Sequence, residues 1–209
     1  MKIGIDVDGV LVDMEGYQKK YGQIYFKKMF KKEIVNPAAY DIEQMFECTH
    51  EEREKFWIKY IWAYCLTQPV IKDAPQIIEK LHNDGHTLVI ITGRVHTTEK
   101  GITGKLFRQM LRHWLKKNRI QYDKIIFCSE KESSTDKLKI CRHEKIDVMI
   151  DDKPENLLAL KDQLKVICYS AVWNEKLHDE NIIKVSGWKD VYKKIEEIEK
   201  GRLRSRSKK

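Results

Sequence analysis

The stretch from Ile3 to Asp13, Ile-Gly-Ile-Asp-Val-Asp-Gly-Val-Leu-Val-Asp, carries two carboxylates, Asp6 and Asp8, around which the rest of the chain is organised. Its apolar start is typical of a buried strand. Asp6 lies at the end of that apolar run, just before a turn that Gly9 predicts. Side chains of an extended backbone point the same way at every second residue, so Asp6 and Asp8 face one small volume. Carboxylates held this close repel each other unless a cation or a shared proton lies between them.

This pair of carboxylates predicts a site for a divalent cation and a phosphate. Magnesium, a hard ion that prefers oxygen ligands, is the natural partner of Asp6 and Asp8. Gly9 has no side chain, so a phosphate can lie against its backbone, and its conformational freedom permits a sharp turn. The alternative interpretation is a strand that simply ends in a polar turn, where Asp is common.

The composition indicates a cytoplasmic globular protein. The 209 residues suffice for one domain, or for a core plus a smaller inserted unit. The five cysteines are odd in number and no two are separated by just two residues, which favours a reducing compartment over a disulfide framework or a zinc site. The sequence has neither a run of about 20 apolar residues that would span a bilayer nor the apolar region of a signal peptide. We therefore expect no membrane association.

The net charge of +8 is concentrated in part at the C-terminus. Residues 201–209 contain five basic residues and no acidic one, so the rest of the chain carries +3. A short basic end of this kind is usually solvated and disordered, and in some proteins it is an arm for polyanions. We expect a disordered basic tail over 201–209.

Residues 14–70 predict a small helical unit inserted after the first strand. Tyr17, Tyr21 and Tyr25 recur every four residues, which places them on one helix face. Thr49 followed by Glu52 is a capping-box signature, and an apolar stripe at helical spacing follows it. We expect most aromatic side chains of this segment to pack its interior.

The chain beyond residue 70 alternates between strands and helices, which predicts an α/β protein with a mostly parallel, doubly wound sheet covered on both faces. In such a sheet ligands bind beyond the carboxyl ends of the strands, where the strand order reverses. Three polar clusters fall at such strand ends, so we expect them to meet at one site. They are Asp6 with Asp8, Thr92 with Arg94, and Asp151 with Asp152, and Lys137 lies near a helix start on the same edge.

These residue types suit a metal-assisted displacement on phosphorus. We expect Asp6 to be the nucleophile that forms an aspartyl phosphate. Asp8 is the candidate general acid for the leaving group and the general base for the hydrolytic water. Asp151, with Asp152 as its helper, is the candidate magnesium ligand together with Asp6 and the backbone carbonyl of Asp8.

The remaining catalytic candidates hold the phosphoryl oxygens. These are the hydroxyl of Thr92 and the ammonium of a lysine. Lys137 and Lys131 both precede Asp151. We favour Lys137, because a donor on a helix is better positioned than one in a loop.

The order and spacing of these motifs resemble those of the haloacid dehalogenase superfamily of phosphatases. The resemblance rests on Asp6-Val-Asp-Gly-Val, Thr92, the following lysine and Asp151-Asp152, and it covers the chain outside the insert and the tail. It implies a Rossmann-like core, magnesium as cofactor, the residue roles above, and an insert similar to the superfamily's helical cap of the first type. The expected division is a core over 1–13 and 71–200, a cap over 14–70 and a tail over 201–209.

Within the superfamily, two stretches resemble the 5'(3')-deoxyribonucleotidase group. They are the first motif followed by Glu15-Gly16, and Ile-Asp-Asp-Lys-Pro-Glu-Asn at 150–156. The chain departs from the group at Thr92-Gly93-Arg94, where the group usually has Thr-Ser. Arg94 is therefore expected either to contact phosphate or to cap the strand end.

The predicted function is that of a magnesium-dependent phosphomonoester hydrolase acting on a small metabolite such as a nucleoside monophosphate. Candidate substrate-binding residues are Gly9, Gly93 and Arg94 for the phosphate, with Tyr17 and Tyr21 stacking on a base. Three alternatives stay open: a sugar-phosphate phosphatase, a nucleic-acid 3'-end phosphatase that uses the basic tail and the insert's lysines, and a binding protein without turnover.

Overall fold

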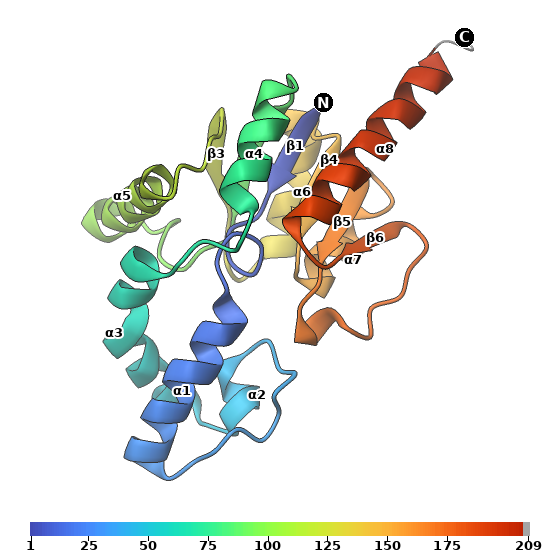
Figure 1. The fold of residues 1–209 in the computed structure, drawn as a ribbon. Helices are drawn as coiled ribbons and strands as arrows, with labels where there is room; N and C mark the ends of the chain where they lie inside the picture. Colours follow the sequence, from blue (N-terminus) through green and yellow to red (C-terminus); the bar gives the residue numbers. More distant parts are fainter. Residues whose placement is uncertain (207–209) are drawn as a thin grey trace.

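A computed structural model describes residues 1–206 as a six-stranded sheet with α-helices around it (Figure 1). In chain order the elements are β1 (Lys2–Ile5), α1 (Met14–Phe30), α2 (Ile42–Phe46), α3 (His50–Thr67), α4 (Ala74–Asn83), β2 (Thr87–Thr92), α5 (Gly101–Lys117), β3 (Lys124–Phe127), α6 (Ser133–Glu144), β4 (Val148–Asp151), α7 (Pro154–Leu160), β5 (Lys165–Tyr169), the 3₁₀ helix η1 (Val172–Asn174), β6 (Ile182–Val185) and α8 (Trp188–Arg206).

The sheet has the strand order β3-β2-β1-β4-β5-β6, and all neighbouring strands are parallel. The chain runs outward from β1 to β3 and then crosses to β4 on the other side of β1. The strand order therefore reverses between β1 and β4, where Ile3 pairs with Val148 and Ile5 with Ile150. This topology confirms the predicted Rossmann-like, doubly wound α/β fold, and it places the expected ligand site at the ends of these two strands.

Alternation along the strands divides the hydrophobic core between the two faces of the sheet. One cluster joins Ile3 and Ile5 of β1 to buried side chains of α4, α5 and α8. The other joins Val89 of β2 and Met149 of β4 to side chains of α6 and α7. Both faces are thus covered, as a buried parallel sheet requires.

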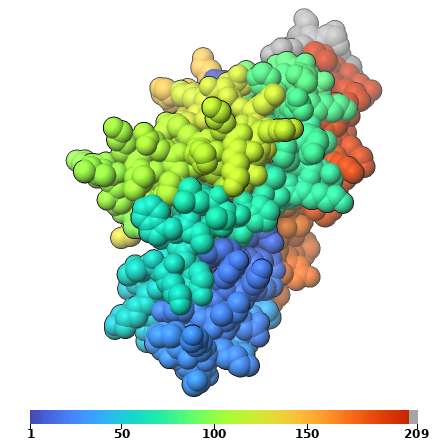
Figure 2. Space-filling view, turned by 60° about the vertical axis from the view of Figure 1, so that its left-hand side comes forward, coloured from blue at the N-terminus to red at the C-terminus, as the bar shows by residue number. Residues whose placement is uncertain are grey.

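Helices α1, α2 and α3 form a group at the end of the sheet, which we call the helical lobe (residues 14–70; Figure 1). The Asp13 side chain accepts a hydrogen bond from Gly16 N at the start of α1, 2.8 Å away. Thr49 and Glu52 form the predicted capping box at the start of α3. Helix α3 packs on α5 of the core, so the lobe and the core form a continuous surface in Figure 2.

The C-terminal residues 201–206 are helical, whereas the sequence predicted a disordered tail there. Helix α8 continues through Gly201 to Arg206, so the expected disordered tail is helical over its first six residues. Arg202 forms an ion pair with Asp147, which ties this part of the helix to the core. Residues 207–209 lie outside the described residues. No helix within residues 1–206 combines the length and the apolar character needed to cross a lipid bilayer.

Candidate active site

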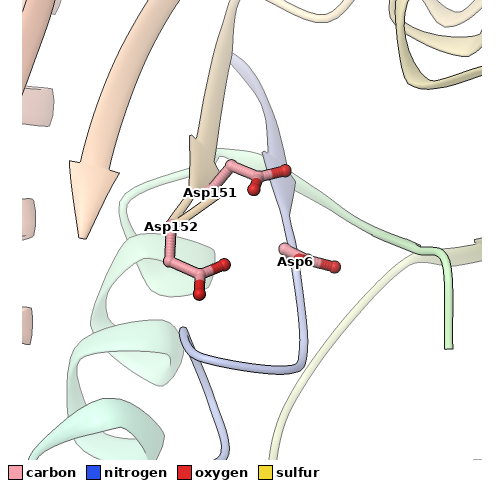
Figure 3. A group of neighbouring side chains, drawn as sticks. All are labelled: Asp6, Asp151 and Asp152. Carbon is pink, nitrogen blue, oxygen red and sulfur yellow. The ribbon is translucent and has the colours of Figure 1, made fainter. Parts of the chain in front are cut away.

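Three carboxylates meet where the strand order reverses. Asp6 directly follows β1, Asp151 ends β4 and Asp152 follows it, and each offers an oxygen that lies within 4.8 Å of those of the others (Figure 3). Asp6 N donates to Ile150 O at 3.0 Å, so the β1–β4 pairing itself holds the first carboxylate beside the other two. All three residues are buried. The structure therefore brings together Asp6, Asp151 and Asp152 as the strand-end argument predicted.

A buried lysine lies among these carboxylates. Lys137 Nζ is 2.6 Å from Asp151 Oδ2 and 3.1 Å from Asp6 Oδ2, and its side chain is 1% exposed. Burial alone would lower the pKa of Lys137, but Asp151 and Asp6 outweigh it and raise the pKa, so the lysine is charged. Helix α6 begins at Ser133, earlier than the start near Lys137 that the sequence predicted. Lys131 lies outside the helix and is exposed.

Asp151 and Asp152 differ sharply in their hydrogen bonding. Asp151 accepts from Lys137 Nζ, from Lys153 N at 2.9 Å and from Asn156 Nδ2 at 3.1 Å. Asp152 Oδ2 and Asp6 Oδ1 are buried and have no hydrogen-bond partner among the described residues. Two buried carboxylate oxygens without donors are costly in a protein interior unless a cation or a proton reaches them.

The electrostatics of the cluster follow from this arrangement. Burial, then the charges of Asp151 and Asp6, raise the pKa of Asp152 well above its usual range. Burial raises the pKa of Asp6 to about 7, against the opposing charge of Lys137 and with the help of Asp151 and Asp8. The single ammonium of Lys137 therefore does not balance three buried carboxyl groups. All potential ligands are oxygen atoms, and the donor set fits a hard divalent ion such as magnesium.

Gly9 is required by the close approach of Asp152. Its φ is 79°, and a Cβ placed on it would lie 1.9 Å from Asp152 Oδ2. A side chain here would displace the carboxylate. Gly93 also packs closely, since a Cβ there would be 3.1 Å from Ser129 O in the loop before α6. Contacts of both glycines with substrate stay predictions.

Asp8 lies apart from the three-carboxylate cluster, with its side chain 17% exposed. Its Oδ1 accepts a hydrogen bond from Tyr64 Oη at 2.5 Å, and Arg94 Nη2 is 3.7 Å from the same oxygen. The side chains of Asp6 and Asp8 thus have different partners, although sequence spacing alone gave them one environment. The expected metal contact of the Asp8 backbone carbonyl stays a prediction.

Thr92 and Arg94, at the end of β2, are also buried with unused hydrogen-bonding groups. The Thr92 hydroxyl has no partner among the described residues, and neither do Nε, Nη1 and Nη2 of Arg94. The Arg94 guanidinium lies over the Tyr64 ring, 4.8 Å from its centre, and its side chain is 2% exposed. A buried guanidinium whose three nitrogens make no hydrogen bond, and which faces Asp8 at 3.7 Å, still has donors to offer to an anion.

The two tyrosines predicted to stack on a base belong to the packing of the helical lobe. Tyr17 is 3% exposed, its hydroxyl donates to Tyr60 O at 3.0 Å, and its ring contacts those of Tyr21 and Tyr64. A base could reach Tyr17 only by displacing these neighbours. Tyr21 is partly buried against Tyr60.

Two other aromatic side chains, those of Tyr40 and Trp173, lie beside the carboxylates. Trp173 Nε1 donates to Asp152 O at 3.2 Å, and the Tyr40 ring packs edge-on against Trp173 with centroids 5.1 Å apart. Burial, followed by the charges of Asp152 and Asp8, raises the pKa of Tyr40 well above its usual range. The sequence carried no signal for Tyr40, because it lies in a loop of the lobe and reaches the site only through tertiary packing.

The chain is similar in sequence to nucleotidases and in fold to a phosphatase. A nucleotidase of Clostridium acetobutylicum is 26% identical over 193 residues, which cover 92% of each chain. A protein of Chlorobaculum tepidum predicted to be a 5'(3')-deoxyribonucleotidase is 25% identical over 206 residues, or 92% of this chain and 89% of its own. The crystal structure of a predicted phosphatase from Clostridium acetobutylicum has a TM-score of 0.64 at 18% identity, over 94% of this chain and 98% of that one, and shares the fold.

The family comparison covers nearly the whole chain. The family described as 5' nucleotidase, deoxy (pyrimidine), cytosolic type C protein matches residues 1–202. A haloacid dehalogenase superfamily hydrolase from Geobacter sulfurreducens shares the fold, with a TM-score of 0.55 at 13% identity over 91% of this chain and 93% of that one. The chain therefore has the fold of that haloacid dehalogenase superfamily hydrolase, and it is a phosphoric monoester hydrolase that belongs to the cytosolic type C family of 5'-nucleotidases.

Proposed function

We propose that this protein is a magnesium-dependent nucleotidase that hydrolyses a nucleoside monophosphate through an aspartyl phosphate on Asp6. The observation that carries the proposal is the cluster of Asp6, Asp151 and Asp152 around Lys137, with two buried carboxylate oxygens free of hydrogen bonds. The nucleotidase relatives support the substrate class.

The unused carboxylate oxygens indicate which residues would hold magnesium. Asp6 Oδ1 and Asp152 Oδ2 are the unused oxygens, whereas both oxygens of Asp151 are engaged by Lys137, Lys153 N and Asn156. Asp6, Asp152 and the Asp8 carbonyl would hold the ion, and Asp151 would position Lys137. When bound, the ion neutralises the carboxylates and the charge on the transferred phosphoryl group.

The chain's own residues perform the transfer. Asp6 attacks phosphorus, and Asp8 gives a proton to the leaving oxygen and later takes one from water. Lys137, Thr92 and Arg94 donate to the phosphoryl oxygens, which would satisfy the unused groups of Thr92 and Arg94.

Magnesium is expected to stabilise the protein, and Asp152→Asn to remove that effect. The folded pKa of Asp6, about 7, exceeds its ordinary value, so metal-free protein should lose stability as pH rises from about 4 to 7. Asn at 152 removes one buried charge, so its Tm in EDTA should exceed that of wild type by about 4 °C. Thermal unfolding at neutral pH with EDTA and with magnesium measures both effects.

The surface acid Asp162 provides the matched control, because it is exposed. Asp162→Asn should keep the magnesium-induced rise in Tm. A full magnesium response in Asp152→Asn would contradict the assignment of Asp152 as a ligand.

The Tyr40 ring is proposed to select the substrate's base. It lies beside Trp173 and under Lys153, whose Nζ is 5.0 Å from the ring centre. Base stacking on an aromatic ring contributes about 1–3 kcal/mol. Tyr40→Leu should therefore raise KM for a deoxyribonucleoside monophosphate about tenfold, and leave KM for p-nitrophenyl phosphate unchanged.

A substrate panel tests the substrate class directly. We expect the highest kcat/KM with deoxyribonucleoside 5'- or 3'-monophosphates, compared with sugar phosphates and with a 3'-phosphorylated oligonucleotide, each with and without magnesium. A higher value with a sugar phosphate would reassign the enzyme to the sugar-phosphate alternative, and a higher value with the oligonucleotide would make it an end phosphatase.

The charges of the helical lobe argue against a track for a nucleic-acid backbone. Lys19, Lys27, Lys32 and Lys55 each form an ion pair with a glutamate. These four lysines are thus partly neutralised within the protein.

We also propose a cytoplasmic location, in keeping with five free cysteines, four of them buried.

A further inference from the structure

Tyr64 links the helical lobe directly to a catalytic carboxylate. It lies in the last turn of α3, is 3% exposed, and its hydroxyl donates to Asp8 Oδ1. Burial, followed by the charge of Asp8, raises the pKa of Tyr64 well above its usual range. The 2.5 Å contact itself makes the phenol the donor to Asp8, because a carboxylate oxygen accepts and a phenol carries its proton at neutral pH.

The Tyr64 ring is fixed by packing from several elements. The Arg94 guanidinium lies over the ring at 4.8 Å, and the ring centroids of Tyr17 and Trp57 are 4.9 and 5.7 Å away. These neighbours come from the β2–α5 loop, from α1 and from α3 itself. The position of the hydroxyl is thus set by the packing of the lobe against the core.

This contact distinguishes the two oxygens of Asp8. Oδ1 receives the Tyr64 hydroxyl and faces Arg94 Nη2 at 3.7 Å. Oδ2 forms no hydrogen bond with any described residue, and the Asp8 side chain is partly exposed. Oδ2 is therefore the oxygen that is free to exchange a proton with a ligand.

We propose that Tyr64 is a positioning residue that holds Asp8 through Oδ1, so that Oδ2 faces the leaving oxygen of the substrate. In the first step the bond from Asp6 to phosphorus forms, the bond from phosphorus to the leaving oxygen breaks, and the proton on Oδ2 passes to that oxygen. In the second step water adds to phosphorus, the bond to Asp6 breaks, and Oδ2 takes the water's proton. The inference rests on the proposed general acid–base role of Asp8.

The hydrogen bond from Tyr64 makes Asp8 depend on the position of the helical lobe. Asp8 lies in the loop after β1, whereas Tyr64 belongs to α3, which packs on α5 (Figure 2). A displacement of α3 from α5 would withdraw the hydroxyl from Asp8. Proton transfer by Asp8 thus depends on a docked lobe.

Tyr64→Phe tests the proposal, because it removes the hydroxyl and keeps the ring that packs on Arg94 and Tyr17. With a deoxyribonucleoside monophosphate, whose leaving alkoxide needs a proton, the rate of the first chemical step should fall about 10- to 100-fold. With p-nitrophenyl phosphate, whose phenolate leaves without a proton, the first-turnover burst of p-nitrophenol should keep its wild-type rate. The substrate dissociation constant, taken from the concentration dependence of the first-turnover rate, should stay within about twofold of wild type for both substrates, since Tyr64 positions Asp8 and does not bind substrate.

Tyr25→Phe is the matched control within the same lobe. Tyr25 is buried and packs against Phe56 and Tyr60, and no hydrogen bond of its hydroxyl to another described residue is found. It should behave as wild type with both substrates. If Tyr64→Phe slowed the first chemical step equally with both substrates, Tyr64 would have a structural role. If it left the rate of that step unchanged with both, the hydrogen bond would have no effect on catalysis. Either result overturns the inference.

The same experiment separates this inference from the proposed function. Wild-type protein that forms no covalent phosphate from either substrate would refute the aspartyl-phosphate mechanism itself. Wild-type protein that shows a burst, together with a Tyr64→Phe variant that shows no selective loss, would refute the role of Tyr64 alone.

Discussion

Asp6→Asn is expected to lower kcat by at least about 10⁴-fold, because it replaces the nucleophile by an amide that cannot form an acyl phosphate. The protein should remain folded. The substitution is nearly isosteric, and the second partner of Lys137, Asp151, still lies 2.6 Å from the ammonium. Removing a buried carboxyl group whose pKa is raised to about 7 should even stabilise the metal-free protein at neutral pH.

The measurement combines steady-state turnover with detection of the intermediate. Wild-type enzyme quenched with acid during turnover should carry one phosphoryl group on the peptide that contains Asp6, and Asp6→Asn should carry none. Asp162→Asn, at an exposed carboxylate, should match wild type in both assays. An Asp6→Asn variant that retains more than about 1% of wild-type kcat would exclude Asp6 as nucleophile.

The sequence predicted the position of Asp6 because two simple rules act on it. A short apolar run marks β1, and ligands gather at the carboxyl ends of parallel strands. The same rules placed Asp151 and Asp152 at the end of β4. The sequence favoured Asp151 over Asp152 as the magnesium ligand, although adjacent acids have the same chemistry in a sequence and nothing in it shows which of them is already hydrogen-bonded. The difference arises from tertiary contacts: Asp151 meets Lys137 and Asn156, whereas Asp152 lies against Gly9.

The aromatic residues show a second limit of sequence reasoning. Tyr64 continues the apolar stripe of α3 at helical spacing, so its pattern is that of a core residue. Its hydroxyl nevertheless reaches Asp8. Tyr17 has the same kind of pattern on α1 and is enclosed by the lobe. Periodicity identifies the buried face of a helix, but not which buried hydroxyl meets a polar group across the fold.

Lys137→Met should have the second largest effect, on both stability and activity. The ammonium is the cation nearest to Asp6 and Asp151, and the variant would leave these buried carboxylates without it. Removal of one partner of a buried ion pair costs about 3–5 kcal/mol. Tm in EDTA should therefore fall by about 10 °C, and magnesium should recover part of the loss. Loss of a donor to the phosphoryl oxygens should lower kcat by about 10²- to 10³-fold.

Lys131→Met is the matched control, and it decides between the two lysines that the sequence offered. Lys131 is exposed, so this variant should keep wild-type Tm and kcat.

The double variant Lys137→Met with Asp151→Asn separates stability from catalysis, because it removes one positive and one negative charge from the cluster. Its Tm should rise above that of Lys137→Met, since fewer buried carboxylates then lack a cation. Its kcat should stay low, because the phosphoryl oxygens still lack their lysine donor. If restoring the charge balance also restored kcat, Lys137 would act by stabilising the carboxylate cluster, and the phosphoryl group would be held by Thr92 and Arg94 alone.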